Sequence, residues 1–343
     1  MTPSPTHMHA EIAEIPAVLR RLLADPGENL HAAGRQLRRL DPALLVTVAR
    51  GSSDHAASYL KYAIELTAGI PVASLSPSIV SIYATPLKLR QAAGIAISQS
   101  GQSPDLLATV EAVRAGGGFT MALTNQTGSP LAALADTAID LQAGPELSVA
   151  ATKSFVASVA AGLAILAHWQ ADTALASALA ALPEQLDRAI TCDWSRLMPV
   201  FEATTSLFVL GRGPAQAIAS EAALKFKETC GLHAEAYSAA EVLHGPAAIL
   251  RDGFPVLALM SGDASEPGMA ETVARLAGQG AAVFATTDLD TGAAKLAHVT
   301  TGHRLTEPLC LIVSFYSFIE ALARHRGFDP DHPPHLRKIT ETR

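Results

Sequence analysis

The sequence is poor in cysteine. Its three cysteines, Cys192, Cys230 and Cys310, stand far apart and lack the paired spacing of a zinc site. Their odd number does not suit a disulfide framework. None of the twelve histidines has the HExxH spacing of zinc enzymes. We therefore predict a chain that holds its thiols reduced in the cytoplasm and that has no metal site.

Long apolar runs and basic stretches are also missing. The longest apolar runs, such as 155–167, are too short and too interrupted to cross a bilayer. Residues 1–16 contain no basic region leading into an apolar segment, so we expect no signal peptide. The net charge is −7 and no basic stripe is present, which argues against nucleic acid as a partner. A small anionic substrate stays open, because backbone N–H groups, hydroxyls and helix N-termini bind phosphate without changing net charge.

What the sequence does have is an internal repeat. Segments 46–69 and 207–231 each contain a short apolar run, a glycine-containing turn and a helical pattern that ends at glycine. At an offset of 162 positions, six residue pairs are identical: Arg50 and Arg212, Gly51 and Gly213, Ala57 and Ala219, Ser58 and Ser220, Thr67 and Thr229, Gly69 and Gly231. Any two α/β domains share a loose likeness, but identities at one fixed offset favour duplication.

The pattern after each copy predicts the fold. Apolar strands at 95–98 and 119–125 flank a helix over 103–117, and the second half repeats this order. Continuous apolar strands between amphipathic helices indicate parallel sheets covered on both faces. At 343 residues, 49% of them hydrophobic, the chain suits two such α/β domains. We predict a doubly wound, flavodoxin-like fold with a leader helix over 8–25. The expected parts are 1–32 (leader), 33–170 (first domain), 171–194 (helical connector), 195–326 (second domain) and 327–343 (tail).

A candidate phosphate loop follows the strand at 95–98. Its residues are Ser98, Gln99, Ser100, Gly101, Gln102 and Ser103. Glycine permits a tight turn, and the hydroxyls lie beside free N–H groups at the start of the next helix. Asp105 complements the dipole of that helix, and Ser52 and Ser53 add donors at the same sheet end. The alternative is an ordinary serine-capped helix. We favour phosphate because two loops at one sheet end carry the donors.

A second candidate cluster lies on the helix of the second copy. Glu221, Lys225 and Glu228 are spaced so that they share one helix face. Such residues usually form a solvated salt bridge. The following run 233–246, expected as a loop or short helix, concentrates further acid–base groups: His233, Glu235, Tyr237, Glu241 and His244. We therefore interpret the cluster as catalytic.

Five motifs occur in the order of a known family. They are ISQSGQSPD (97–105), SVAATKSF (148–155), EAALKFKE (221–228), HAEAYSAAEVLHGP (233–246) and LRKITET (336–342). The chain resembles the isomerase half of glucosamine-6-phosphate synthase (glutamine-fructose-6-phosphate aminotransferase), which is built from two SIS domains. It lacks the glutaminase half, and standalone chains of this kind resemble type II glucosamine-6-phosphate deaminase and fructosamine-phosphate deglycases.

This resemblance implies roles for individual residues. Ser53, Ser98, Gln99, Ser100 and Ser103 would bind the sugar 6-phosphate, with Val149, Ala151 and their neighbours lining the sugar. Glu228 would move the proton between C1 and C2, and Lys225 would stabilise the developing enolate or enolamine. His244, from the partner subunit of a homodimer, would assist ring opening, and Lys338 would lie near C1 and C2. No cofactor is implied.

Four positions depart from the synthase pattern. The synthase has serine at Ala151, alanine at Arg337, cysteine at Arg50 and glutamate at Gln102. We expect a deaminating isomerase that converts glucosamine 6-phosphate to fructose 6-phosphate and ammonia. Fructosamine 6-phosphate deglycation and action on the galactosamine epimer stay open as alternatives. A sugar-phosphate sensor is the non-enzymatic alternative, but the sequence shows no helix-turn-helix region, and a sensor needs no acid–base cluster.

Overall fold

The computed structural model describes residues 5–25 and 28–338. The chain divides into two compact units. Of the described residues, the first-sheet unit contains those within Ala17–Glu146 and Lys153–Ala180 together with Arg337 and Lys338, and the second-sheet unit contains residues 5–16, Leu147–Thr152 and Ala181–Leu336. Helices α1 (His7–Ala24) and α8 (Thr173–Ile190) contribute residues to both. They correspond to the predicted leader and connector helices, while the predicted five-part domain division stays a prediction.

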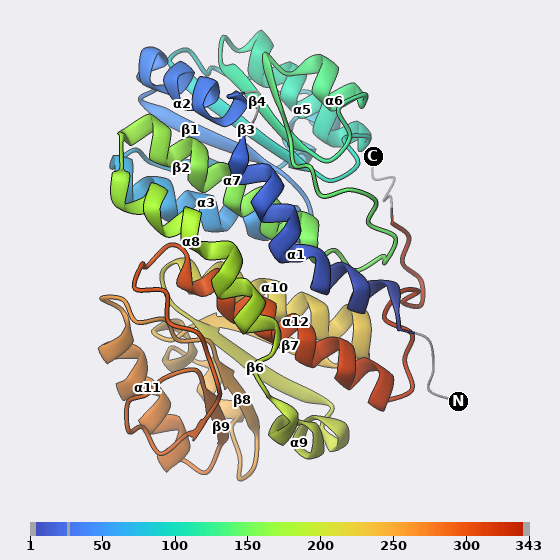
Figure 1. Ribbon diagram of the computed structural model, residues 1–343, viewed down its shortest axis with the longest axis vertical. Coiled ribbons are helices and arrows are strands. Elements are labelled where there is room, and N and C mark those ends of the chain that lie inside the picture. The colour runs from blue at the N-terminus through green and yellow to red at the C-terminus, as the bar shows by residue number, and fades with distance from the viewer. Residues whose placement is uncertain (1–4, 26–27, 339–343) are drawn as a thin grey trace. The chain divides into compact units, whose positions relative to one another are not determined.

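The first-sheet unit is a doubly wound α/β layer structure (Figure 1). Its strands are β1 (Leu44–Val48), β2 (Val72–Ser74), β3 (Ala92–Ser98), β4 (Phe119–Thr124) and β5 (Thr137–Asp140). All pair in parallel, in the order β2-β1-β3-β4-β5. Its helices are α2 (Asn29–Leu40), α3 (Ser52–Ala68), α4 (Ser78–Ser81), α5 (Pro104–Ala115), α6 (Pro130–Leu134) and α7 (Lys153–Gln170). This is the predicted flavodoxin-like order.

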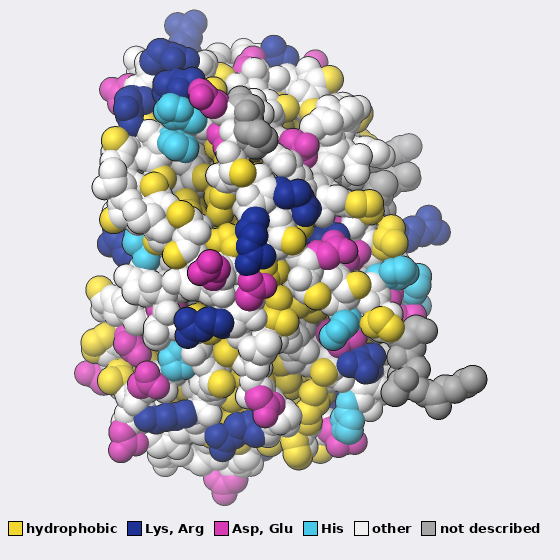
Figure 2. Space-filling view, viewed as in Figure 1, with side chains coloured by type: hydrophobic (Ala, Val, Ile, Leu, Met, Phe, Trp, Pro, Cys, Tyr) yellow, Lys and Arg dark blue, Asp and Glu magenta, His cyan; other side chains and the backbone are white. Residues whose placement is uncertain are grey.

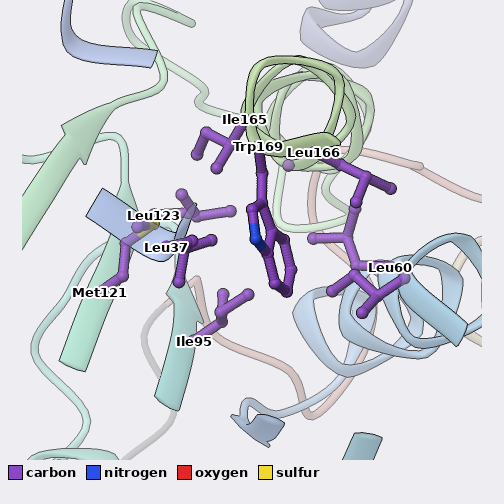
Figure 3. A pocket seen from close by; sticks show the side chains of 10 residues that line it. Leu37, Leu60, Ile95, Met121, Leu123, Ile165, Leu166 and Trp169 are labelled. Carbon is purple, nitrogen blue, oxygen red and sulfur yellow. The ribbon is translucent and has the colours of Figure 1, made fainter. Parts of the chain in front are cut away.

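Successive side chains along the buried strands point to opposite faces of this sheet, and each face packs against a different set of helices. Val48, Ala96 and Ala122 pack with α5 and α6 in one cluster. The neighbouring positions in the strands, such as Ile95 and Met121, face the opposite side, because successive side chains point to opposite faces. There they line a small apolar pocket together with side chains of α2, α3 and α7 (Figure 3). Its free space is about 10 Å³, enough for one water molecule at most. This pocket is part of the core.

Small residues let the helices of this unit approach closely. A Cβ atom added at Gly162 of α7 would lie 2.4 Å from Leu60 Cδ1 of α3. A larger residue at position 162 would therefore force the Leu60 side chain to shift, because real Cβ contacts do not come below about 3 Å. Glycine lets α3 and α7 pack at this point without that shift.

The second-sheet unit repeats the same topology. Its strands are β6 (Ser206–Gly211), β7 (His233–Ser238), β8 (Pro255–Ala258), β9 (Ala282–Ala285) and β10 (Ala294–Lys295), in the order β10-β9-β8-β6-β7, all parallel. Its helical segments are η1 (Ser195–Leu197), α9 (Met198–Ala203), α10 (Pro214–Cys230), η2 (Glu241–Leu243), η3 (Pro246–Ile249), α11 (Glu266–Gly278) and α12 (Glu307–His325). The shared strand order confirms the two-domain α/β prediction.

The core of the second-sheet unit also has two sides. On one side, Phe208 and Val256 of the sheet pack with Met269 and Val273 of α11. On the other, aromatic rings of α9, α10 and α12 pack together, and the centroids of Phe226 and Phe315 are 5.2 Å apart. The rings fix α10 against α12, and α10 carries the predicted acid–base residues.

One local prediction was wrong. The run 233–246 was expected as a loop or short helix, but its first part forms strand β7, in register with β6 from Ser206↔His233 to Gly211↔Ser238. Only its second part is helical, in the short turns η2 and η3. β7 is an edge strand, and an edge strand tolerates polar side chains because its outer side is not covered by another strand. The polar composition therefore concealed the strand.

Two further observations concern the surface. Among the helices formed by residues 5–25 and 28–338, none has the length and apolar character that a membrane span demands. On the face shown in Figure 2, basic side chains are scattered among acidic ones and form no continuous stripe over the part of the chain described.

Candidate active site

The predicted phosphate loop joins β3 to α5 in the first-sheet unit. Ser98 is the last residue of β3, and its Oγ accepts a hydrogen bond of 3.1 Å from the Gly101 N–H. Gly101 has a φ of +62°, and a Cβ there would lie 2.2 Å from Ser129 Oγ. Backbone conformation and space both require glycine at this position. The loop is therefore a defined tight turn.

The serine hydroxyls of this loop do not serve the helix. Ser103 is the N-cap residue of α5, but its side chain makes no capping hydrogen bond. The Ser100 hydroxyl likewise makes no hydrogen bond to the residues that the structure describes. Because the capping interpretation required such a bond, the geometry favours the phosphate interpretation.

The neighbouring strand brings further donors to the same place. β1 and β3 are adjacent and parallel, with Val48 opposite Ala96, so the loops after them leave the same sheet edge. Ser53 lies in the first turn of α3, just beyond β1. The strand order reverses between β1 and β3, and such a switch point is where open α/β sheets bind ligands. The structure thus gathers Ser53 with Ser98, Gln99, Ser100 and Ser103 at one sheet end.

A charged pair that the sequence did not predict borders this loop. Arg50 follows β1, and its Nη2 lies 2.9 Å from Oδ2 of Asp105 in the first turn of α5. The Asp105 side chain is buried, whereas that of Arg50 is half-exposed. Both residues were noted separately in the sequence, but no local signal connects positions 55 residues apart.

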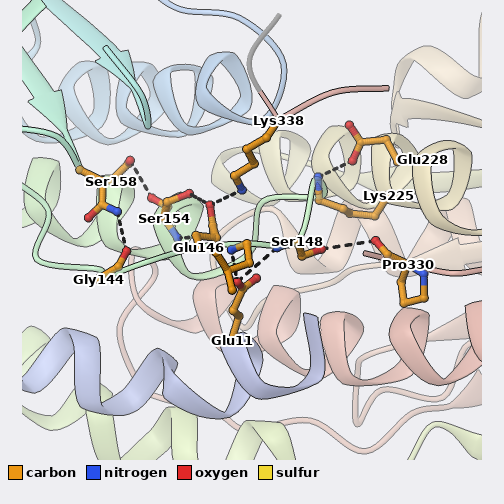
Figure 4. A network of polar contacts seen from close by, with 12 residues as sticks. Glu11, Gly144, Glu146, Ser148, Ser154, Ser158, Lys225, Glu228, Pro330 and Lys338 are labelled. Carbon is orange, nitrogen blue, oxygen red and sulfur yellow. Dashed lines mark hydrogen bonds and ion pairs between the residues drawn. The ribbon is translucent and has the colours of Figure 1, made fainter. Parts of the chain in front are cut away.

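Lys338 of the tail forms a second unpredicted pair, with Glu146 of the same unit (Figure 4). Lys338 Nζ lies 2.9 Å from Glu146 Oε2, and Ser154 donates its N–H (3.0 Å) and its hydroxyl (2.7 Å) to this carboxylate. Burial alone would raise the pKa of Glu146, but the Lys338 ammonium and the Ser154 donors outweigh it and hold this pKa below its usual value. Glu146 therefore anchors Lys338 as a charged pair.

The acid–base cluster is built on α10 of the second-sheet unit. Lys225 Nζ lies 2.7 Å from Glu228 Oε2 and 3.1 Å from Glu221 Oε1 (Figure 4 shows the first contact). The side chains of Lys225 and Glu221 are fully buried, and that of Glu228 is 19% exposed. The predicted common helix face is confirmed, and burial excludes the ordinary solvated salt bridge.

Burial gives this cluster unusual proton affinities. Burial, aided by the charge of Glu228, raises the pKa of Glu221 to about 7 despite the nearby Lys225 ammonium and a 3.1 Å hydrogen bond from the Tyr316 hydroxyl. Glu221 Oε2 makes no hydrogen bond to the described residues. Burial works against the charged form of Lys225, but the two carboxylates outweigh it and raise its pKa. Lys225 thus stays a cation beside the partly exposed Glu228 carboxylate.

Three further predicted site residues belong to the second-sheet unit: Val149, Ala151 and His244. The Val149 N–H donates to the Asp331 carbonyl at 3.1 Å, and Ala151 is partly buried in the same short segment. His244 ends the η2 turn and is exposed. The His244 side chain makes no hydrogen bond or ion pair to the described residues. The structure therefore joins Lys225 to Glu228 by a hydrogen bond, but not His244 to either.

In the second-sheet unit, the corresponding loop donates its N–H groups to side chains of the protein. It follows β8, where Glu307 Oε1 accepts the Gly262 N–H at 2.6 Å. Asp263 accepts the Ser265 N–H at 2.7 Å and the Ser261 hydroxyl at 3.3 Å. The second loop thus gives its N–H groups to carboxylates, whereas in the first loop Gly101 donates to the neutral Ser98 hydroxyl and no carboxylate accepts from Ser100 among the described residues. The fold is duplicated, but the arrangement of donors and acceptors in this loop is not.

Comparisons with known proteins agree with this geometry. The model of the SIS domain matches residues 43–168 and 201–303. The chain is 34% identical to a glutamine–fructose-6-phosphate aminotransferase (isomerizing) of Symbiobacterium thermophilum, over 96% of the chain and 58% of that protein. An Aeropyrum pernix protein of the same name is 33% identical, over 97% of the chain and 57% of its own length. The chain thus spans a little under three fifths of the length of these relatives.

Solved structures give the same result. A protein from Silicibacter pomeroyi DSS-3, proposed to be a phosphosugar isomerase, is 52% identical with a TM-score of 0.92, over 95% of the chain and all of that structure. Glucosamine-6-phosphate deaminase of Thermotoga maritima shares the fold, with a TM-score of 0.78 at 20% identity, over 98% of the chain and all of that structure. Two matched domain segments, two parallel sheets of one topology and these relatives lead to one conclusion: the chain belongs to the SIS domain family.

Proposed function

We propose that this protein is a phosphosugar isomerase that deaminates an amino-hexose 6-phosphate, converting glucosamine 6-phosphate to fructose 6-phosphate and ammonia. The observation that carries the proposal is the α10 cluster, in which a buried Lys225 cation lies 2.7 Å from the partly exposed Glu228. A structural ion pair needs no such asymmetry between a fully buried cation and an accessible carboxylate. Proton transfer at a carbon next to a carbonyl uses an accessible base, and a cation close to it stabilises the enolate that forms.

The chemistry assigns a role to each group. In the ring-opened substrate, Glu228 takes the proton from C2, and electron density moves onto the C1 oxygen. The Lys225 ammonium stabilises this developing enolate by its charge. Glu228 then returns the proton to C1, and the C1 oxygen takes a proton from the C2 amino group, which leaves a C1 hydroxyl and a neutral imine at C2. Water hydrolyses this imine to the ketone of fructose 6-phosphate and releases ammonia. The residues on α10 thus supply the base and the stabilising charge.

In this proposal the loop Ser98–Ser103, together with Ser53, holds the 6-phosphate. Two observations support it, namely the hydroxyls that α5 does not use for capping and the position at the sheet's switch point. Lys338, anchored by Glu146, is proposed to act at C1 and C2, and His244 is proposed to act from a second subunit of a homodimer in ring opening. A cytoplasmic location is part of the same proposal.

The relatives support the isomerase part more than the choice of substrate. Those named glutamine–fructose-6-phosphate aminotransferase carry "isomerizing" in their names and extend well beyond the matched stretch. We therefore carry over isomerisation and not amino transfer. Deglycation of fructosamine 6-phosphates is the second candidate, favoured by the departure at Arg50, where the synthase pattern has cysteine and this chain has a cation beside the loop.

A substrate panel tests the proposal. The purified protein is incubated with glucosamine 6-phosphate, galactosamine 6-phosphate and fructosamine 6-phosphates, and ammonia and fructose 6-phosphate are measured separately. Equal amounts of both products from glucosamine 6-phosphate are expected. Glutamine with fructose 6-phosphate serves as the control and should give no glucosamine 6-phosphate. Tight binding of these compounds without turnover of any would favour the sensor.

A further inference from the structure

Arg50 occupies the switch point of the first sheet. It lies two residues beyond the end of β1, next to the loop that follows β3. Its Nε (3.0 Å) and Nη2 (2.9 Å) both donate to Oδ2 of Asp105. The guanidinium is therefore held within hydrogen-bond distance of the first turn of α5, the helix on which the proposed phosphate loop ends.

The buried Asp105 creates an electrostatic problem for an anion at this position. Its side chain is 1% exposed, and its negative charge sits in the same first turn whose N–H groups would bind phosphate. The negative charge of Asp105 in this turn would repel an incoming phosphate. The positive charge of Arg50 compensates the negative charge of Asp105, and the same ion pair holds the guanidinium beside the loop.

The pairing does not use up the donors of Arg50. A guanidinium has five N–H groups, and the two hydrogen bonds to Asp105 leave three. These make no hydrogen bond or ion pair to the described residues, and 51% of the side chain is exposed. The remaining donors are thus held at the loop and open to an anion.

The duplicated half of the chain provides an internal comparison. Arg212 occupies the matching position after β6, but it is exposed and makes no hydrogen bond or ion pair to the part of the chain described. In that unit Glu307 already accepts the N–H of Gly262 in the loop. An arginine anchored to the helix occurs only where the loop is open, which favours a role in binding over a role in holding the fold.

We propose that Arg50 is a specificity-determining residue of the phosphate site, binding the phosphoryl oxygens of the sugar phosphate with the donors that Asp105 leaves open. This inference rests on the proposed function, since it assumes that the loop holds the 6-phosphate. The ligand class is a sugar phosphate in its dianionic form, which a planar guanidinium matches with paired hydrogen bonds. The competing explanation is that the pair only ties the β1 turn to α5.

Calorimetric titration with glucitol 6-phosphate, an open-chain analogue that cannot isomerise, tests the inference. Arg50→Gln should weaken binding by about 10- to 100-fold, the usual effect of losing hydrogen bonds between charged groups. Arg114→Gln is the matched control, because Arg114 forms a similar exposed pair with Asp136 near the opposite end of α5. It should leave the affinity unchanged. Circular dichroism of each variant confirms that it is folded.

A double substitution separates ligand binding from charge compensation. Arg50→Gln/Asp105→Asn removes the cation and the buried charge together, so the site stays neutral. If Arg50 binds the ligand, the double variant stays weakened by about 10-fold or more. Affinity restored to the wild-type value, or unchanged affinity in Arg50→Gln, would overturn the inference. Ser100→Ala tests the loop itself: if it has no effect, the phosphate site is wrong, whereas an effect of Ser100→Ala alone rejects only the role of Arg50.

Discussion

Replacing Glu228 with glutamine tests the proposed mechanism most directly. Glu228 Oε2 accepts a 2.7 Å hydrogen bond from Lys225 Nζ, and the amide oxygen of glutamine can accept the same bond. The substitution therefore removes the proton acceptor with little change in shape. Loss of a general base costs about 10²- to 10⁴-fold in rate, or about 3–5 kcal/mol of barrier. Stability should also fall, by up to about 3–5 kcal/mol, because Glu228 is one of the two carboxylates that hold the fully buried Lys225 cation, so thermal unfolding of the variant accompanies the assay.

The assay follows two events in the same sample, the exchange of the C2 proton with deuterated solvent and the release of ammonia. Both should fall together in Glu228→Gln, while affinity for glucitol 6-phosphate is retained. Glu241→Gln is the control, since Glu241 is exposed in the η2 turn of the same unit. If Glu228→Gln exchanges the C2 proton at a rate near that of the wild type, Glu228 is not the base. In that case Glu241 becomes the next candidate.

Three further predictions follow from the site. Ser100→Ala should weaken binding of the 6-phosphate by about 1.5–3 kcal/mol without lowering the thermal unfolding midpoint, and unchanged affinity in titration would remove the loop from the mechanism. The pKa of Glu221 rises from 4.5 to about 7 on folding, so its stabilising contribution is complete below pH 4.5 and is lost as pH rises through about 7. Urea unfolding should show the free energy of wild type falling relative to Glu221→Gln by up to a few kcal/mol over that window, and parallel curves would contradict it. Mixing inactive His244→Ala and Glu228→Gln chains should restore part of the activity if His244 acts across subunits, and no recovery despite proven subunit exchange would count against a shared site.

Local features of the sequence predicted the fold well. The central strands β1, β3 and β4 of the first sheet, β6, β8 and β9 of the second, and helices such as α5 and α11 follow from apolar runs and glycine turns, which are signals between near neighbours. The turn at Ser98–Ser103 was predicted for the same reason, because its serines lie close together in the sequence, and its role in binding phosphate stays a prediction. The common face of Glu221, Lys225 and Glu228 follows from helical spacing alone.

Contacts between distant residues could not be predicted in this way. Glu146 and Lys338 are 192 positions apart, and nothing near either residue indicates the other. Burial was equally hidden: the spacing of Lys225 fits a surface salt bridge as well as the fully buried cation that the structure contains. The strand β7 was missed because its position at the sheet edge permits the polar residues that an interior strand excludes.

Because carboxylates accept the N–H groups of the loop after β8, the two halves should respond differently to substrate. Glu307 already holds the Gly262 N–H, so that half of the duplication carries a permanent internal ligand. In the Ser98–Ser103 loop the Gly101 N–H donates to Ser98 Oγ, but the Ser100 hydroxyl makes no hydrogen bond to the described residues and, in the proposed function, binds an anion from solution. If the proposal is right, phosphate binding should slow amide hydrogen exchange in the first loop and leave the Gly262 amide, protected from the start, unchanged. On this proposal, one half of the duplication is complete when folded and the other is completed by substrate.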